Sequence, residues 1–150
     1  MRVNSPTKVA NLNADTIDGR DSSEFGLVPE VEPWHEVGGA GEPAFEGGFD
    51  NDATEHSRIT PTTVAFYKDP FGVVHLRGAA LTRTASISGQ WSTVFTLPAG
   101  YRPPATVFPN RRDELLIQPD GRIEAGVWTA NDGSSYGFAA LEGISFRAAE

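Results

Sequence analysis

Three kinds of side chain in this sequence could carry chemistry: paired carboxylates, histidines and aromatic rings. The pairs Asp113-Glu114 and Asp120…Glu124 are of the kind that glycosidases use. They border turns and an expected strand face, where carboxylates are ordinarily solvated. The sequence also holds no Gly-x-Ser-x-Gly elbow, P-loop or dinucleotide fingerprint. We therefore expect no catalytic residues and no enzyme activity, with a polysaccharide hydrolase as the alternative.

Potential metal ligands are present, but their spacing predicts no metal site. His35-Glu36 begins like a zinc-protease helix, but glycines follow and no second histidine lies one helical turn on. We expect His75 on the outer face of a strand, and His35 and His56 in loops. Asp50-Asn51-Asp52, with Glu55 nearby, offers oxygen ligands suited to calcium but lacks the EF-hand spacing, which favours a solvated acidic loop. Neither a metal nor another cofactor is expected.

Aromatic side chains give the strongest indication of a binding site. Along Arg122–Thr129, alternation places Ile123, Ala125 and Val127 on one face and Arg122, Glu124 and Trp128 on the other. If the first face is core, Trp128 is exposed beside charged groups, a common platform for sugar rings or a partner surface. For Trp128 itself we favour packing in a subunit interface or under the loop at 131–135 over contact with a ligand, since interfaces also favour tryptophan. The predicted ligand-binding residues are Trp128, Tyr136, Glu124 and Arg122.

Short strands separated by turns are expected to position these residues. Asp69-Pro70-Phe71-Gly72 has the residue preferences of a type I turn, and Pro119-Asp120-Gly121 predicts a hairpin. The strands expected around these turns are Thr63–Lys68, Val73–Gly78, Ser92–Leu97, Ala105–Phe108, Glu114–Gln118, Arg122–Thr129, Tyr136–Leu141 and Gly143–Ala148. About eight strands at roughly 8–12-residue spacing predict an all-β sandwich or barrel. Of the two, we expect an antiparallel, jelly-roll-like β-sandwich.

Charge divides the chain into two parts. Residues 1–60 carry 12 acids and 4 bases, a net charge of −8, whereas residues 61–150 carry 8 of each and are neutral. We expect a stalk, linker or docking segment at 1–33 and the β head at 34–150, with its strand-rich part from about residue 60.

Several classes of protein are disfavoured by composition. No basic face is available to displace counterions from phosphates, so no nucleic-acid binding is expected. No segment approaches the ~18–20 consecutive apolar residues that a membrane helix needs, which predicts no membrane insertion. The first residues lack the apolar region of a secretory signal, so no signal peptide is expected.

Several blocks of the sequence carry a resemblance to known proteins: Val64–Asp69 followed by Gly72–Gly78, Phe95–Pro103, Ile117–Ile123 and Leu141–Phe146. Together these blocks resemble the C-terminal receptor-binding domains of phage tail fibres and related tail proteins. Upstream, Asn13–Ser22 (NADTIDGRDS) is similar to a short repeat of tail-fibre shafts and of some secreted actinobacterial proteins.

The resemblance implies a homotrimer with a β-sandwich head at the virion surface, on the exterior of the tail or capsid. It implies attachment to a host cell-surface receptor, generally a saccharide, and contact with other virion proteins through residues 1–30. Ligand-binding residues vary in this family, so none is transferred to this sequence. The alternative is a trimeric structural or decoration protein of a capsid or tail, docked through its N-terminal segment.

Overall fold

The computed structural model describes residues 16–17, 20–21, 30–51, 62–83, 91–109, 115–129, 133 and 135–149. The chain divides into two units, residues 1–30 and 31–150. In the first unit, β1 (Thr16–Ile17) pairs antiparallel with β2 (Arg20–Asp21). Most of the predicted stalk at 1–33 lies outside the described residues.

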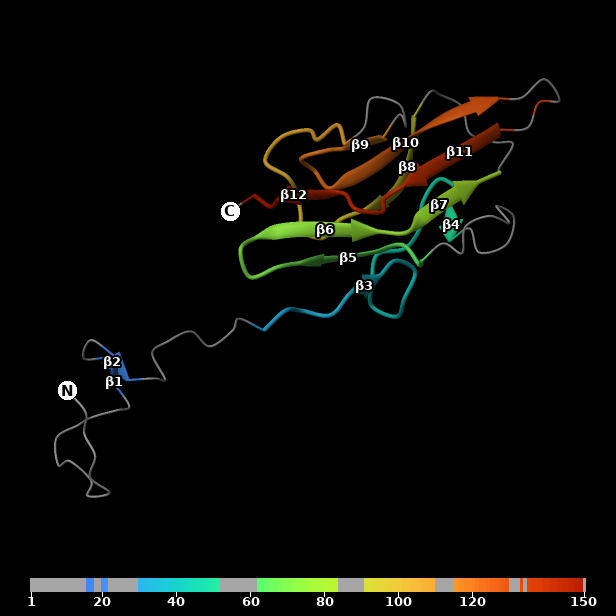
Figure 1. The fold of residues 1–150 in the computed structure, drawn as a ribbon. Coiled ribbons are helices and arrows are strands. Elements are labelled where there is room, and N and C mark those ends of the chain that lie inside the picture. Colours follow the sequence, from blue (N-terminus) through green and yellow to red (C-terminus); the bar gives the residue numbers. More distant parts are fainter. Residues whose placement is uncertain are drawn as a thin grey trace, which may run out of the picture. The chain divides into compact units, whose positions relative to one another are not determined.

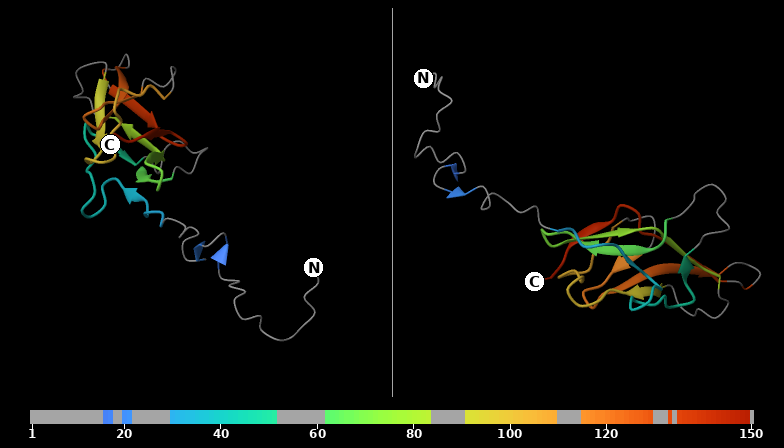
Figure 2. Two further views of the ribbon diagram at one scale, coloured as in Figure 1. Left: turned by 90° about the vertical axis from the view of Figure 1, so that its left-hand side faces the viewer. Right: turned by 90° about the horizontal axis from the view of Figure 1, so that it is seen from below.

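The second unit consists of two antiparallel sheets, and Figures 1 and 2 show β5 and β6 in one layer with β8 and β10 in the other. The four-stranded sheet has the order β12 (Ser145–Arg147), β6 (Val73–Arg77), β5 (Ala65–Lys68), β3 (His35–Glu36). The six-stranded sheet has the order β4 (Asp50–Asn51), β7 (Ala79–Thr82), β11 (Ser135–Ala140), β10 (Arg122–Thr129), β8 (Trp91–Thr96), and β9 (Leu115–Ile117) also pairs with β10. The described part of the chain contains no helix, and the predicted all-β sandwich is confirmed.

The core lies between the two sheets and uses the apolar positions that alternation predicted. Ile123 and Ala125 of β10 are fully buried, and Val127 is nearly so. In β8 two consecutive residues, Val94 and Phe95, are both buried. This departs from strict alternation because the register with β10 shifts there, between the pairs Ile123↔Phe95 and Glu124↔Thr93.

One predicted strand is nearly absent. Of Ala105–Phe108, only Val107 pairs, through a single bridge to Ile117. Pro104 and Pro109 flank this segment, and neither can donate a ladder hydrogen bond. The short strands β3, β4 and β7 were not expected as separate strands.

The turn at Asp69–Gly72 joins β5 to β6 as predicted and sets their register. The Asp69 N–H donates to the Val73 carbonyl at 2.8 Å, and the Gly72 N–H donates to the Asp69 carbonyl at 2.9 Å. Oδ1 of Asp69 accepts the Phe71 and Val73 N–H groups, both at 2.9 Å. The resulting register places Tyr67 opposite His75.

The chain passes from one sheet to the other at Gly78, where β6 runs into β7 (Figure 1). Gly78 has a φ of 86°, and a Cβ there would lie 2.6 Å from the carbonyl oxygens of both Thr62 and Thr63. Only glycine adopts this conformation without strain and leaves room for that neighbouring backbone.

Candidate functional site

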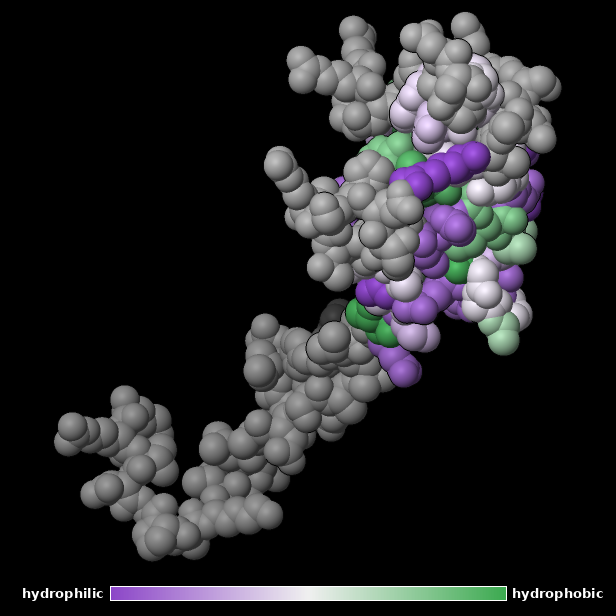
Figure 3. Space-filling view, turned by 90° about the vertical axis from the view of Figure 1, so that its right-hand side faces the viewer, coloured by the Kyte–Doolittle hydropathy of each residue, from purple (hydrophilic) through white to green (hydrophobic). Residues whose placement is uncertain are grey.

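Two of the four predicted ligand-binding residues lie together. Trp128 and Tyr136 are directly opposite in β10 and β11, with ring centroids 6.4 Å apart, and Trp128 is 54% exposed as expected. Trp91, 40% exposed, stands opposite Gly126 on the same outer face. These three rings, Trp91, Trp128 and Tyr136, form what we call the aromatic patch. Figure 3 shows the molecule from the side where β10 ends and β11 begins, and its hydrophobic areas come from other residues, because tryptophan and tyrosine are weakly hydrophilic on this scale.

The other two predicted residues belong to a separate cluster. Glu124 precedes Trp128 by four residues, about 13 Å along an extended strand. Arg122 bridges Asp120 (2.9 Å) and Glu124 (3.0 Å), and Glu124 also accepts a hydrogen bond from Gln118. Donation by the Arg122 N–H and guanidinium lowers the pKa of Asp120. The expectation that Glu124 is solvated was wrong, because only 13% of its side chain is exposed.

The outer face of the four-stranded sheet carries a continuous stack that we call the aromatic ladder: Arg77, Trp34, Tyr67 and His75. The Arg77 guanidinium carbon lies 4.5 Å from the centre of the Trp34 ring. Trp34 meets Tyr67 edge-on at 4.5 Å, and Tyr67 stacks on His75 at 4.7 Å with only 13° between the rings. Neighbours thus fix each ring of the ladder.

Both ends of the ladder have a carboxylate partner. Arg77 Nη2 lies 3.2 Å from Glu36, and His75 Nε2 lies 3.1 Å from Asp69. The pKa of Asp69 is lowered, chiefly by the Val73 N–H and further by His75. The Nε atom of Arg77 is buried without a hydrogen-bond partner, so the guanidinium is held by its ring stack and its ion pair.

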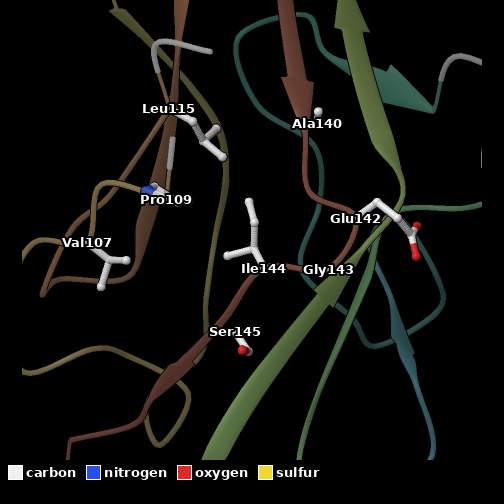
Figure 4. A pocket seen from close by; sticks show the side chains of 8 residues that line it. All are labelled: Val107, Pro109, Leu115, Ala140, Glu142, Gly143, Ile144 and Ser145. Atoms are coloured by element: carbon white, nitrogen blue, oxygen red, sulfur yellow. The ribbon is translucent and has the colours of Figure 1, made fainter. Parts of the chain in front are cut away.

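Two hollows flank the turn between β11 and β12. The ladder hollow, about 380 Å³, is lined by Trp34, Thr62, Tyr67, His75, Leu76, Arg77, Glu142, Gly143 and Ile144. The turn hollow, about 400 Å³, is lined by Val107, Pro109, Leu115, Ala140, Glu142, Gly143, Ile144 and Ser145. Ile144 projects into the turn hollow, whereas the Glu142 carboxylate points away from it (Figure 4). Oε2 of Glu142 accepts the Thr62 hydroxyl and the Gly78 N–H, both at 3.0 Å.

A second polar cluster ties residues 32–42 to the sheets. His35 Nδ1 lies 2.9 Å from Glu42 Oε1, and its Nε2 lies 3.3 Å from the Tyr101 hydroxyl. The Tyr101 hydroxyl donates to Glu32 at 3.0 Å, and Glu32 also accepts the Lys68 N–H. Burial and the Glu32 carboxylate raise the pKa of Tyr101 to about 12, the opposite of what a phenolate nucleophile requires. The cluster therefore acts as a structural tie.

The expectation that His35 lies in a loop was wrong, because it forms β3 and pairs with Phe66 of β5. His75 lies in β6 as expected. Among the described residues, no three histidine, aspartate or glutamate side chains converge on a point where a metal could bind. Asn51 directs its side-chain oxygen to the Val64 N–H at 2.7 Å. Asp52, Glu55 and His56 lie outside the described residues.

No family model, curated protein or solved structure matches this chain. In the described residues, no helix is long and apolar enough to cross a membrane.

The sequence did not single out Tyr67, His75, Arg77 or Glu142 as site residues. The signal available for the first two was the Asp69–Gly72 turn, whose geometry fixes the Tyr67↔His75 pair.

Proposed function

We propose that this chain is a phage tail-fibre or tail-tip protein whose trimeric β head binds a saccharide receptor on the host cell surface. The observation that carries the binding role is the ladder hollow. It combines rings that neighbours hold in place with hydrogen-bonding groups at its rim, the composition of small-ligand sites. The assignment to a phage tail rests on the resemblance of the sequence blocks at 64–78, 95–103, 117–123 and 141–146.

Sugars suit such a hollow because their C–H faces pack on aromatic rings while their hydroxyls need polar partners. Trp34 supplies a ring that is 37% exposed. Glu142 offers a carboxylate at the rim, and His75 and Arg77 lie beside the rings. A trimer would present three such hollows and convert weak single contacts into avidity.

Cell binding tests the proposal. The full chain, labelled, is expected to bind a subset of a panel of bacterial strains, and Trp34→Ala is expected to lose that binding while remaining folded. Trp128→Ala is the matched control. Light scattering is expected to give the mass of a trimer, and a concentration-independent monomer would contradict that part of the proposal.

A second candidate is a trimeric decoration or structural protein on the exterior of a capsid or tail. The observation that favours it is the division at residue 30, since a separate N-terminal unit suits docking to other virion proteins. Full-length protein that docks on virus particles through residues 1–30 but binds none of the cells would favour this candidate.

A further inference from the structure

We propose that the receptor is an uncharged oligosaccharide that lies across the turn at Gly143, with one part in the ladder hollow and another in the turn hollow. This inference rests on the proposed function and adds the class of saccharide and its minimum extent. It uses the shape of the turn and the charges of the described lining residues.

The two hollows are neighbours on the surface. Both are lined by Glu142, Gly143 and Ile144, so this turn forms the ridge between them. Each hollow has a volume at the lower end of the range for small-ligand sites. A ligand confined to either hollow would leave the other unused, whereas a chain of sugar units could fill both.

The ridge is low at its middle. Gly143 has a φ of 76°, and a Cβ built there would meet no heavy atom within 4 Å. The space above Gly143 is therefore open, with the Glu142 carboxylate on one side and the Ile144 side chain on the other (Figure 4). A glycosidic linkage could pass over this saddle without moving the protein.

The charges of the lining disfavour an anionic sugar. Arg77, the permanent cation of the described lining, already has a carboxylate partner at 3.2 Å, and the His75 ring likewise lies 3.1 Å from a carboxylate. Glu142 adds a carboxylate at the ridge that is bonded to two neutral donors. A sialic or uronic acid placed here would meet negative charge without an unpaired cation among the described lining residues.

The test is a glycan array of neutral oligosaccharides of one to six units, together with sialylated and uronic-acid counterparts, probed with the full-length protein. Affinity is expected to rise at least tenfold from single sugars to chains that span both hollows. Anionic counterparts of the best neutral chain are expected to bind at least tenfold more weakly.

The variant Gly143→Asn tests whether the ligand crosses the turn at Gly143. Asparagine tolerates a positive φ, and its side chain would fill the open space above this turn. For this variant, affinity should no longer rise with the length of the oligosaccharide, whereas its affinity for short sugars should be unchanged. Gly72→Asn is the matched control, since Gly72 also has a positive φ, 79°, with open space around it, and lies outside both hollows. If Gly143→Asn fails to fold, the length series of the unmodified protein still decides the question.

The outcomes separate this inference from the function it rests on. Equal affinity for single sugars and long chains, or a preference for anionic chains, would overturn the inference while leaving receptor binding intact. Binding to cells without binding to any arrayed saccharide would likewise overturn it. Binding to neither cells nor saccharides would remove the proposed function as well.

Discussion

The two sheets carry aromatic side chains on their outer faces in opposite ways. On the four-stranded sheet, Trp34 and Tyr67 lie within a stack that has a carboxylate partner at each end and borders a hollow. On the six-stranded sheet, Trp91 and Trp128 are the more exposed tryptophans, and Trp128 has one ring neighbour, Tyr136, among the described residues.

In the aromatic ladder, neighbouring side chains hold the rings in place, whereas the rings of the aromatic patch have less such support. Rings that neighbours hold in place lose little conformational freedom when a ligand binds, so more of the contact energy appears as affinity. Exposed rings without such support are typical of surfaces that another protein surface covers. This difference supports the proposal that the aromatic ladder binds the ligand and that the aromatic patch packs against another protein.

The largest expected effect is a loss of stability when Gly78, where the chain passes from one sheet to the other, is substituted. Gly78→Ala combines a positive φ with contact between Cβ and two backbone oxygens at 2.6 Å. Strain and overlap together should destabilise the fold by about 3 kcal/mol or more. Gly72→Ala has a similar φ with open space around it and should cost only about 1–2 kcal/mol. Denaturant titration of both variants measures the difference, and equal losses would show that the close approach at Gly78 does not matter.

The next largest effect is on saccharide affinity, and it distinguishes the aromatic ladder from the aromatic patch. Trp34→Ala removes the exposed ring of the ladder and leaves Arg77 and Tyr67 without their neighbour. We expect affinity for the bound saccharide to fall at least ~tenfold, equivalent to about 1.4 kcal/mol. Trp128→Ala should change it less than about twofold, because that ring lies on the other sheet. Titration calorimetry compares the two variants, and a larger loss for Trp128→Ala would reverse the assignment of the two faces.

The sequence predicted the six-stranded face better than the four-stranded one. Alternation along Arg122–Thr129 gave the bounds of β10 and the exposure of Trp128, since both follow from one strand and its neighbours. What alternation could not show is that Arg122 and Glu124 form an ion pair with each other.

The ladder depends on contacts between distant segments. Tyr67 and His75 could be paired from the Asp69–Gly72 turn, because a hairpin turn fixes register. Trp34 and Glu142 come from segments far away in the chain, and tertiary packing alone brings them to the same hollow. Local patterns therefore predicted the strands but not the site.

A smaller effect tests how the ladder is held. Arg77→Lys keeps the positive charge near Glu36 but loses the flat guanidinium that stacks on Trp34. The expected loss of stability is about 0.5–1 kcal/mol, the size of a partly exposed cation–π contact. Saccharide affinity should fall with it, because Trp34 becomes less constrained. Thermal unfolding and binding are measured on the same preparation, and unchanged affinity would mean that the stack does not prepare the site.

The smallest effect is on stability at alkaline pH, and it concerns the hydrogen bond from Tyr101 to Glu32. Tyr101 has a folded-state pKa raised to about 12, above the value near 10 that a tyrosine has in an unfolded chain. The unfolded state therefore releases this proton first, and the stability present below about pH 10 is lost as the pH rises toward 12. Tyr101→Phe should remove this component, so its melting temperature should fall less steeply over that range than that of the unmodified protein. Tyr136→Phe, on the aromatic patch, is the matched control and should retain the steeper fall. If Tyr101→Phe and the unmodified protein fall in parallel, the Glu32–Tyr101 bond does not hold residues 32–42 against the sheet, and the rigidity of Trp34 must come from the ladder alone.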